Sequence, residues 1–460
     1  MQNTKETSTT ISNSKWLVKS APSPNSVSLA QSPVVGSWFL PETFVSIDAI
    51  QTSKQSTHYK PPAPRVGASL VYFNSTAYLF AGASHEDGYF NSIHALNLES
   101  RVWKAIKPRS KFKPIARYDH LSLIVDQRLR QTDSKQMLVF GGAADDGLLN
   151  DLWLYSFEFE EWIQIEAKGV MPSPRTIQSC GYAKTLESEK IFIFGGGAGG
   201  DEPIPDSHVY CLNVKSMLWS HFKNLGSENP PPLHGHSTVL VTKNGRDMLV
   251  VFGGMYGTNH MLLQADKTEI TSSNVWILDL QSKLWTCFSA SSCGYESENP
   301  WPKSRSGHTL TVVNHRKLTK SITCCILTGG MHRSSNTIQG VKVLDDVWLL
   351  YIDDTDNVKI FWKCLEPMDE IVGNKETGAG YTGGIDASVC SIPADSAITG
   401  MIEIEANVSA VSAAAENLCL QVDISSKKTG LNESKPDEAL LLFGGMDLRS
   451  VNNTVRVLKF

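Results

Sequence analysis

A short pattern recurs along the chain and limits the folds that it can adopt: an apolar run that ends in two small residues. Six copies are present, ending at Ala81-Gly82, Gly141-Gly142, Gly195-Gly196, Gly253-Gly254, Gly329-Gly330 and Gly444-Gly445. The final glycines of successive copies lie 60, 54, 58, 76 and 115 residues apart. The first three intervals approach a structural repeat of about 50 residues, and the last two indicate insertions.

Three other positions recur in register with the glycine pair. An arginine precedes the pair in four copies, at Arg65, Arg117, Arg175 and Arg305, and Leu233 takes this place in another. An Asn/Asp-x-Trp motif follows the pair, as in Asp151-Leu152-Trp153, Asn274-Val275-Trp276 and Asp346-Val347-Trp348. A tryptophan then closes five copies: Trp103, Trp162, Trp219, Trp285 and Trp362. Each copy therefore predicts four short strands, separated by turn residues, in one antiparallel sheet.

The composition and the repeat together predict how these sheets are arranged. Aromatic residues make up 9% of the chain and charged residues only 19%, and strands such as Leu249–Phe252 are apolar on both sides. One such sheet cannot bury both of its faces, whereas six sheets arranged radially each pack on the next. The glycine pair permits close approach of a neighbouring chain, and the same copy's closing tryptophan is expected to fill that space. The predicted fold is all-β, a six-bladed β-propeller.

These residues resemble the kelch-repeat family, whose blades carry a Phe-Gly-Gly run, an Asn/Asp-x-Trp motif and a closing tryptophan, with Arg-x-Gly-His before them. The match covers residues 64–460 apart from one insertion. Ala81 and Leu233 depart from the family pattern, and the sixth copy begins weakly at Gly380–Gly384. The resemblance implies a kelch-type β-propeller in which the repeated motifs are structural.

The two ends of the repeat array predict how the ring closes. The sixth copy has a predicted third strand, Thr454–Phe460, but no closing tryptophan follows. We expect a strand near residues 36–50, containing Trp38, to complete this blade, with Trp16 as the alternative. Residues 1–35 are predicted to be a disordered Ser/Thr-rich tail, and residues 36–460 the propeller. Within it, residues 367–438 contain 12 acidic and 4 basic residues, which predicts a long, acidic and largely disordered insertion in the last blade.

Charge and cysteine content narrow the functional classes. A net charge of −5 and a pI near 6.2 disfavour nucleic-acid binding as the main task. No stretch approaches the ~18 apolar residues of a membrane span, and the polar N-terminus lacks the apolar core of a secretory signal. The nine cysteines include no Cys-x-x-Cys pair and are expected to be reduced thiols. The expectation is a cytoplasmic monomer.

The sequence contains no convincing catalytic constellation. Gly-x-Ser-x-Gly, P-loop and His-Glu-x-x-His motifs are absent. The run Gly195–Gly200 ends a predicted strand and opens a turn, so it is interpreted as a loop rather than as a phosphate cradle. His234-x-His236 has no second pair of metal ligands, and a structural role for His236 is favoured, since it falls in the same repeat position as His120 and His308. No catalytic, cofactor-binding or metal-binding residue is therefore predicted.

The four arginines that precede the glycine pairs are the candidate binding residues. Arg65, Arg117, Arg175 and Arg305 occupy equivalent positions, and equivalent positions in a propeller lie on one ring. Four guanidinium groups there would form a positive rim suited to a carboxylate or phosphate on a partner. The alternative, which the residues favour, is an internal ion pair with acids in the neighbouring blade's loops, such as Asp151, Asp206 or Asp346.

The expected function is a non-catalytic scaffold that binds a protein through loops on one face. Within the kelch family, the layout of the chain is most similar to effectors of Rab GTPases, on the evidence of Arg117–His120, Pro172–Thr176 and Phe443–Met446. That similarity implies binding of a GTP-bound Rab GTPase in endosome-to-Golgi vesicle traffic, with association at endosomal membranes only through the partner. No contact residue can be transferred, because the shared positions are structural.

Three other functions are possible alternatives, and the sequence supports each of them less than it supports a Rab-effector-like scaffold. A kelch scaffold unrelated to Rab GTPases would show the same motifs. A galactose-oxidase-like enzyme would need a Tyr–Cys cross-link, further tyrosines and two histidines for copper, and no convincing set is present. A cullin ligase substrate receptor would carry BTB and BACK regions or an F-box, whereas only some 60 polar residues precede the first repeat.

Overall fold

The structure is a computed structural model that describes most of residues 62–365 and three strands beyond them. Within 62–365 it leaves out 99, 101, 127–134, 178, 186–187, 200–201, 244, 258–269, 294–300, 314–321, 334–340, 345 and 354–357. The chain divides into two units, Met1–Ser32 and Pro33–Phe460, and every described residue belongs to the second. The predicted tail, Trp16, Trp38 and the strand near 36–50 lie outside the described residues.

Five four-stranded antiparallel blades follow one another along the described chain, and in each the strands pair in chain order. The first blade contains β1 (Ser69–Phe73), β2 (Thr76–Phe80), β5 (Ile93–Asn97) and β6 (Val102–Ile106). The second contains β7 (Leu121–Val125), β8 (Gln136–Ala144), β9 (Gly147–Ser156) and β10 (Glu161–Ile165). The third contains β12 (Gly181–Lys184), β13 (Glu189–Phe194), β16 (Val209–Asn213) and β17 (Leu218–Phe222). The fourth contains β18 (Ser237–Lys243), β19 (Arg246–Phe252), β20 (Val275–Asp279) and β21 (Leu284–Phe288). The fifth contains β22 (Thr309–Val313), β23 (Ile322–Thr328), β26 (Val347–Asp353) and β27 (Lys359–Leu365).

Short additional pairs extend these blades. Three small hairpins connect second to third strands: β3 (Ala83–Ser84) with β4 (Gly88–Tyr89), β14 (Gly197–Gly199) with β15 (Glu202–Pro203), and β24 (Met331–Arg333) with β25 (Val341–Val343). The strand β11 (Lys168–Gly169) pairs in parallel with the outer strand β17. No helix among the described residues is long and apolar enough to cross a membrane. The seven cysteines whose side chains are described are all free.

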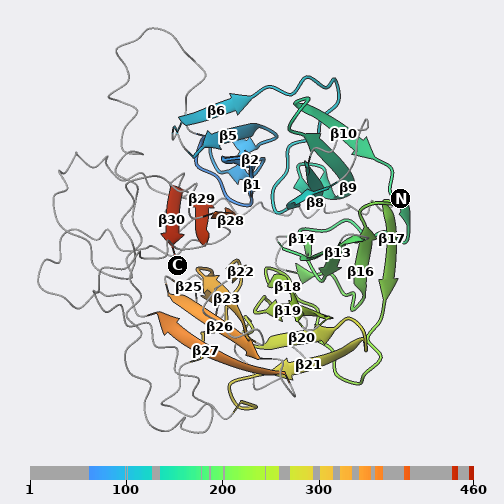
Figure 1. Ribbon diagram of the computed structural model, residues 1–460, viewed down its shortest axis with the longest axis vertical. Helices are drawn as coiled ribbons and strands as arrows, with labels where there is room; N and C mark the ends of the chain where they lie inside the picture. The colour runs from blue at the N-terminus through green and yellow to red at the C-terminus, as the bar shows by residue number, and fades with distance from the viewer. Residues whose placement is uncertain are drawn as a thin grey trace, which may run out of the picture. The chain divides into compact units, whose positions relative to one another are not determined.

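The blades are arranged radially, with the first strand of each nearest the centre (Figure 1). First strands of adjacent blades contact one another, as β1 does β7, β12 does β18 and β18 does β22. The prediction of an all-β propeller is confirmed, with five complete blades. A further sheet of three strands, β28 (Ser388–Pro393), β29 (Glu438–Phe443) and β30 (Val455–Lys459), follows the fifth blade. The strand β28 falls inside the predicted insertion 367–438, and most of the rest of that range lies outside the described residues.

The core lies between neighbouring blades, as the doubly apolar strands predict. Leu249, Val250, Val251 and Phe252 in β19 are all fully buried. Val250 and Phe252 belong to a cluster with residues of the fifth blade, whereas Leu249 and Val251 pack with residues of the third. Because alternate side chains of one strand point to opposite faces, each second strand contributes to two interfaces at once.

Four closing tryptophans pack across blade boundaries, in addition to ring contacts that some of them make with residues of their own copy. The ring of Trp162 lies 4.8 Å from that of Phe80 in the preceding blade. The same contact recurs between Phe140 and Trp219 at 5.1 Å, Phe194 and Trp285 at 5.3 Å, and Phe252 and Trp362 at 5.0 Å. The expectation that each copy's own tryptophan fills the space beside its glycine pair was therefore wrong. The phenylalanine before each of these glycine pairs receives the tryptophan of the next blade, so the aromatic motif joins blades.

Candidate binding site at the mouth of the central channel

The second glycine of each pair forms the seam between adjacent blades. Its N–H donates a hydrogen bond to the carbonyl oxygen at the Arg position of the next blade, where the Arg position denotes Arg65, Arg117, Arg175, Leu233 and Arg305. The N···O distances are 2.8 Å for Gly82 to Arg117, 2.9 Å for Gly142 to Arg175, 3.0 Å for Gly196 to Leu233 and 2.8 Å for Gly254 to Arg305. At Gly142, φ is +97° and a Cβ atom would lie 2.7 Å from the carbonyl oxygen of Tyr118. Only glycine fits this approach without strain.

The arginine side chains turn inward and tie each blade to its own entry segment. Arg117 is fully buried. Its Nη1 donates to the carbonyl oxygen of Gly141 at 3.0 Å and to Asp151 Oδ1 at 2.7 Å, and its Nη2 donates to Asp151 Oδ2 at 2.7 Å. Arg305 repeats the arrangement with Gly329 at 3.0 Å and Asp346 at 2.7 and 2.8 Å. Such bidentate pairs are the strongest class of side-chain hydrogen bond.

The other two arginines use weaker variants of this arrangement. Arg175 contacts the carbonyl oxygen of Gly195 at 2.9 Å but reaches Asp206 with one nitrogen only, at 3.3 Å. Arg65 contacts the carbonyl oxygen of Ala81 at 2.8 Å and Ser92 Oγ at 3.3 Å, and its guanidinium lies 4.0 Å from the centre of the Phe90 ring. Burial lowers the pKa of Arg65 to about 10, and the charge of Asp87 opposes this change.

The four guanidinium groups therefore do not form an accessible rim. Their residues are between 0 and 2% exposed, and the groups hold backbone carbonyls and carboxylates within the protein. The alternative prediction, an internal ion pair, is what the structure shows for Arg117, Arg175 and Arg305, with one correction. Each acid belongs to the blade that its arginine enters, not to the neighbouring blade, because the arginine leads directly into that blade's first strand.

The fourth blade has lost both halves of this pair. Leu233 takes the place of the arginine and is fully buried, and Asn274 takes the place of the aspartate two residues before the motif's tryptophan. In the second blade, the Trp153 Nε1 donates to Asp151 Oδ2 at 2.7 Å. Within the described structure, the buried Nε1 of Trp276 has no such partner. Because the arginine and the aspartate are replaced together in this blade, we interpret the two charges as a pair.

The pKa values of the paired carboxylates are lowered by this pairing. Burial raises the pKa of Asp151, but the hydrogen bonds and charge of Arg117 outweigh it, so that the pKa lies below its ordinary value. Asp346 shows the same balance with Arg305. The pKa of Asp206 falls to about 2, because hydrogen bonds from His208, Tyr210 and Arg175 outweigh the effect of burial.

Three equivalent histidines support the innermost strands. Nε2 of His236 donates to the carbonyl oxygen of Phe194 at 3.1 Å, and Nε2 of His308 to that of Phe252 at 3.1 Å. Nε2 of His120 lies 2.8 Å from Ser69 Oγ. Each bond crosses a blade boundary, which agrees with the structural role expected for His236. The described residues contain no group of three or more side chains suited to hold a metal ion.

Acid should unfold the protein through these histidines. Burial lowers the pKa of His120 to about 3 and that of His236 to about 4, and the pKa of His308 lies well below 6.5. Because the unfolded chain binds these protons near pH 6.5, stability is fully present above that pH and falls as the pH is lowered towards 4. Urea unfolding at successive pH values should show losses of about 1–2 kcal/mol or more per imidazole. The His236→Asn variant should have a shallower dependence, and an unchanged slope would contradict this assignment.

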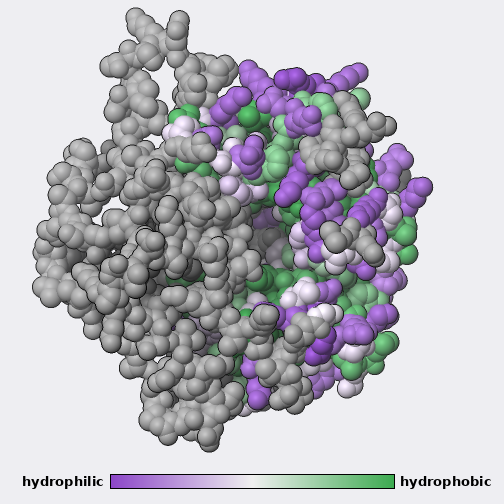
Figure 2. Space-filling model, viewed as in Figure 1, coloured by the Kyte–Doolittle hydropathy of each residue, from purple (hydrophilic) through white to green (hydrophobic). Residues whose placement is uncertain are grey.

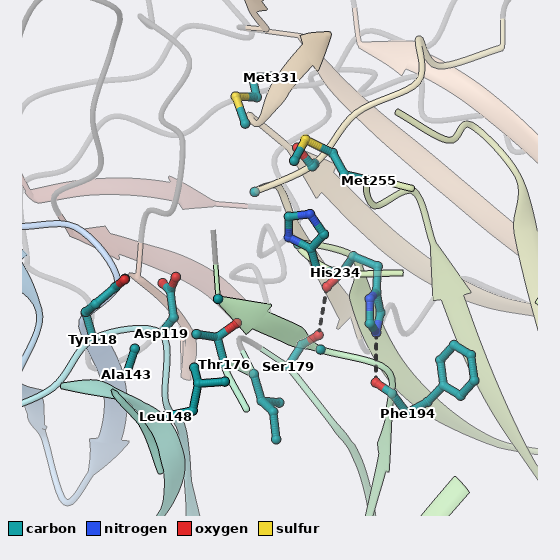
Figure 3. A pocket seen from close by; sticks show the side chains of 17 residues that line it. Tyr118, Asp119, Ala143, Leu148, Thr176, Ser179, Phe194, His234, Met255 and Met331 are labelled. Carbon is teal, nitrogen blue, oxygen red and sulfur yellow. Dashed lines mark hydrogen bonds between the residues drawn. The ribbon is translucent and has the colours of Figure 1, made fainter. Parts of the chain in front are cut away.

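Residues of the second, third, fourth and fifth blades line a pocket at the level of the glycine pairs, and we call this pocket the channel mouth (Figure 3). Its volume is about 290 Å³. Residues that directly follow the Arg position or the glycine pair line it, and Tyr118, Asp119 and Thr176 face His234, Met255 and Met331 across it. Backbone bridges hold this lining in place, joining Tyr118 to Ala143, His234 to Met255 and Ser306 to Met331. The repeated backbone bridges therefore hold the channel mouth in place, and side chains that differ between copies line it.

Asp119 is the acidic residue of this lining, and its backbone is unusual. It has a φ of +49°, whereas glycine occupies the same position in other blades, as Gly67, Gly235 and Gly307, with φ between +60° and +63°. Its N–H donates to the carbonyl oxygen of Gly67 at 2.8 Å. A left-handed residue other than glycine costs about 1 kcal/mol or more, and such residues gather at functional sites. The pocket thus combines one carboxylate with two imidazoles, those of His234 and His236, and two thioethers, a set suited to binding a side chain.

The sequence reasoning did not identify this pocket. It treated Asp119 as part of a structural motif and did not single out Met255 or Met331. The available signal was the substitution itself, because Asp119 stands where three other copies have glycine. The four arginines of the candidate rim are buried, whereas the residues that directly follow Arg117, Arg175 and Arg305, namely Tyr118, Thr176 and Ser306, line the channel mouth.

Radial four-stranded blades, joined by glycine seams and by tryptophans that cross each boundary, define a kelch-type β-propeller. The model of the attractin/LZTR1 β-propeller family matches residues 43–318, which is more than half of the chain. The chain therefore belongs to this family.

Individual relatives with this propeller differ widely in kind. The chain is 31% identical over 202 residues to the Rab9 effector protein with kelch motifs of Mus musculus, covering 43% of this chain and 49% of that one. It is 30% identical over 208 residues to acyl-CoA-binding domain-containing protein 4 of Arabidopsis thaliana, covering 45% and 29%. It is 28% identical over 217 residues to the flagellar outer-arm dynein alpha chain of Chlamydomonas reinhardtii, covering 44% and 4%. The chain thus matches about half or less of each of these relatives.

Proposed function

We propose that this protein is a non-catalytic interaction scaffold that binds a partner protein at the mouth of its central channel. The observation that carries the proposal is the pocket of about 290 Å³ around Asp119, built on a rigid ring of hydrogen-bonded backbone. The buried arginines of four blades and the equivalent histidines of three are engaged in structure, and we assign partner specificity to the lining residues that differ from blade to blade. A partner side chain that carries a positive charge suits a lining with one carboxylate.

The proposed partner is a GTP-bound Rab GTPase, with the protein acting in endosome-to-Golgi vesicle traffic from the cytoplasm. Support comes from the relatives named as Rab9 effectors with kelch motifs, of which the mouse protein is 31% identical over the matched region. A general kelch scaffold unrelated to Rab GTPases is the second candidate. It is favoured by matches of similar strength to an acyl-CoA-binding domain protein and to a dynein chain.

We further propose that the propeller has six blades. The sheet β28–β30 would supply three strands of the last blade, and the segment near residues 36–50 would supply the fourth. Support comes from the contacts of β28 with β1 of the first blade and β22 of the fifth.

A pull-down from cell lysate tests the partner assignment. The full chain is immobilised, and the lysate is loaded with either a non-hydrolysable GTP analogue or GDP. A small GTPase retained only with the GTP analogue is the expected result. Retention of partners regardless of nucleotide would leave the general scaffold and remove the Rab assignment.

The Asp119→Gly variant tests the site itself. It removes the carboxylate but restores the residue found at Gly67, Gly235 and Gly307, so we expect an unchanged or higher melting temperature. Loss of a charge-assisted hydrogen bond should weaken retention of the partner by about tenfold or more. Undiminished retention by this variant would place the contact elsewhere on the propeller.

A further inference from the structure

The segment that connects the first blade to the second is strongly basic. We define the basic linker as residues 104–115, which comprise the end of β6 and the first part of its connection to β7. It contains five cationic residues, all exposed: Lys104, Lys107, Arg109, Lys111 and Lys113. No acidic residue occurs from Val102 to Tyr118, although the whole chain has a net charge of −5. The linker is therefore a local concentration of positive charge on an acidic protein.

The basic linker is held against the outer edge of the second blade. The N–H of Arg109 donates to the carbonyl oxygen of Glu160 at 2.7 Å, and Ser110 Oγ accepts a hydrogen bond from the N–H of Trp162 at 2.9 Å. Pro108 and Pro114 restrict the backbone on either side. Hydrophilic residues gather over this part of the surface (Figure 2), where the chain leaves β6 in Figure 1. The cations are thus presented from a fixed backbone.

Two large apolar side chains protrude among these cations. Phe112 is 70% exposed and Ile115 is 49% exposed. The Nζ of Lys111 lies 5.3 Å from the centre of the Phe112 ring. Within the described structure, Lys107, Lys111 and Lys113 are in no ion pair, and Arg109 makes only a long contact of 3.9 Å with Glu160. Exposed pairs of that length contribute little, so the positive charge of the linker is largely available to a partner.

The equivalent linkers of the next two blades lack this combination. The linker after β10 exposes Val170 and Met171, and its two charged residues, Glu166 and Lys168, have opposite sign. The linker after β17 exposes Leu225, at 73%, and also carries charges of both signs in Lys223 and Glu228. Exposed apolar residues therefore recur on these connections, whereas the cation cluster belongs to the basic linker.

We propose that the basic linker binds an anionic membrane surface directly, with Phe112 and Ile115 inserted between lipid headgroups. Cations near such a surface gain electrostatic attraction to acidic lipids, and an aromatic side chain gains from entering the interface. A protruding side chain suits the deformable surface of a bilayer, whereas a peptide partner would need a concave site around its own anchors. This contact is separate from the channel mouth and does not require the proposed protein partner.

Co-sedimentation of the full chain with vesicles tests the proposal. We expect binding to vesicles of phosphatidylcholine with 30% phosphatidylserine, a composition chosen for the assay, and much weaker binding to phosphatidylcholine alone. Binding should fall as salt is raised, because the charges are exposed. Phe112→Ser should weaken partitioning by about tenfold. Lys111→Gln combined with Lys113→Gln should weaken it by roughly 20-fold.

Leu225→Ser is the matched control. It removes an apolar side chain of nearly equal exposure, 73% against 70%, from the linker that follows β17. Vesicle binding of this variant should equal that of the parent protein, and all variants should keep the parent's melting temperature. The proposal is overturned if Leu225→Ser lowers binding as much as Phe112→Ser, or if lipid charge makes no difference. Capture of an acidic protein through the linker, without vesicle binding, would also overturn it, and none of these results bears on the channel mouth.

Discussion

Gly142→Ala should lower the free energy of unfolding by about 2–5 kcal/mol, the combined cost of left-handed strain and overpacking. The new methyl group would lie 2.7 Å from the carbonyl oxygen of Tyr118 and 2.9 Å from the Cβ atom of His120. Neither can move freely, because Tyr118 belongs to a backbone bridge with Ala143 and His120 is buried at the blade boundary. Relief of the overlap would also weaken the 2.9 Å hydrogen bond from Gly142 to Arg175 in the third blade. Urea unfolding of the parent and variant proteins gives the difference.

Gly147→Ala separates the two contributions to this loss. Gly147 also has a positive φ, +124°, but a Cβ atom there would meet nothing within 4 Å. We expect this variant to lose only about 1–2 kcal/mol, the cost of the backbone angle. Equal losses for Gly142→Ala and Gly147→Ala would show that the inter-blade contact contributes nothing beyond backbone strain.

The strands were predictable from the sequence because their signal is local. The doubly apolar run Leu249–Phe252 lies in β19 and is fully buried, as a strand covered on both faces must be. The glycine pairs were predictable for the same reason: Gly141 and Gly142 both have positive φ and approach the next blade. Such features depend on a few consecutive residues, and the repeat allows each to be checked against several copies.

The contacts between blades were harder to predict, since they depend on how neighbouring sheets are offset. Trp162 could equally have packed beside Gly142 of its own copy, but the radial arrangement places it against Phe80 of the preceding blade. The inward direction of the Arg117 side chain could not be predicted locally either, because its partners Gly141 and Asp151 lie 24 and 34 residues further along the chain. Sequence alone left open whether that charge faced a partner or the interior.

The channel mouth was missed because its lining has no repeating signature. Met255 and Met331 are ordinary residues in the sequence, and they meet only because each follows a glycine pair at the same level of the ring. Asp119 is the exception, since a glycine position filled by aspartate is visible in the aligned copies. At this position the sequence signal of the pocket is a departure from the repeat, whereas agreement with the repeat indicates structure.

Arg117→Leu should lower the free energy of unfolding by about 3 kcal/mol, the loss expected when one partner of a buried ion pair is removed. The substitution leaves the carboxylate of Asp151 with no opposite charge and removes a donor from the carbonyl oxygen of Gly141. Asp151→Asn should be at least as damaging, because it strands a guanidinium that is fully buried. Chemical denaturation of each single variant measures both losses.

The double variant Arg117→Leu with Asp151→Asn copies what the fourth blade already contains at Leu233 and Asn274. With both charges gone, no buried ion is left unpaired, although Trp153 Nε1 would lose its carboxylate acceptor, as the buried Trp276 Nε1 beside Asn274 has none in the described structure. We therefore expect the double variant to be more stable than Asp151→Asn alone, and the two losses to be non-additive by about 1–3 kcal/mol. Strictly additive losses would show that the two residues act independently. In that case, the joint loss of both charges would not explain why the fourth blade is stable, and other contacts would have to stabilise it.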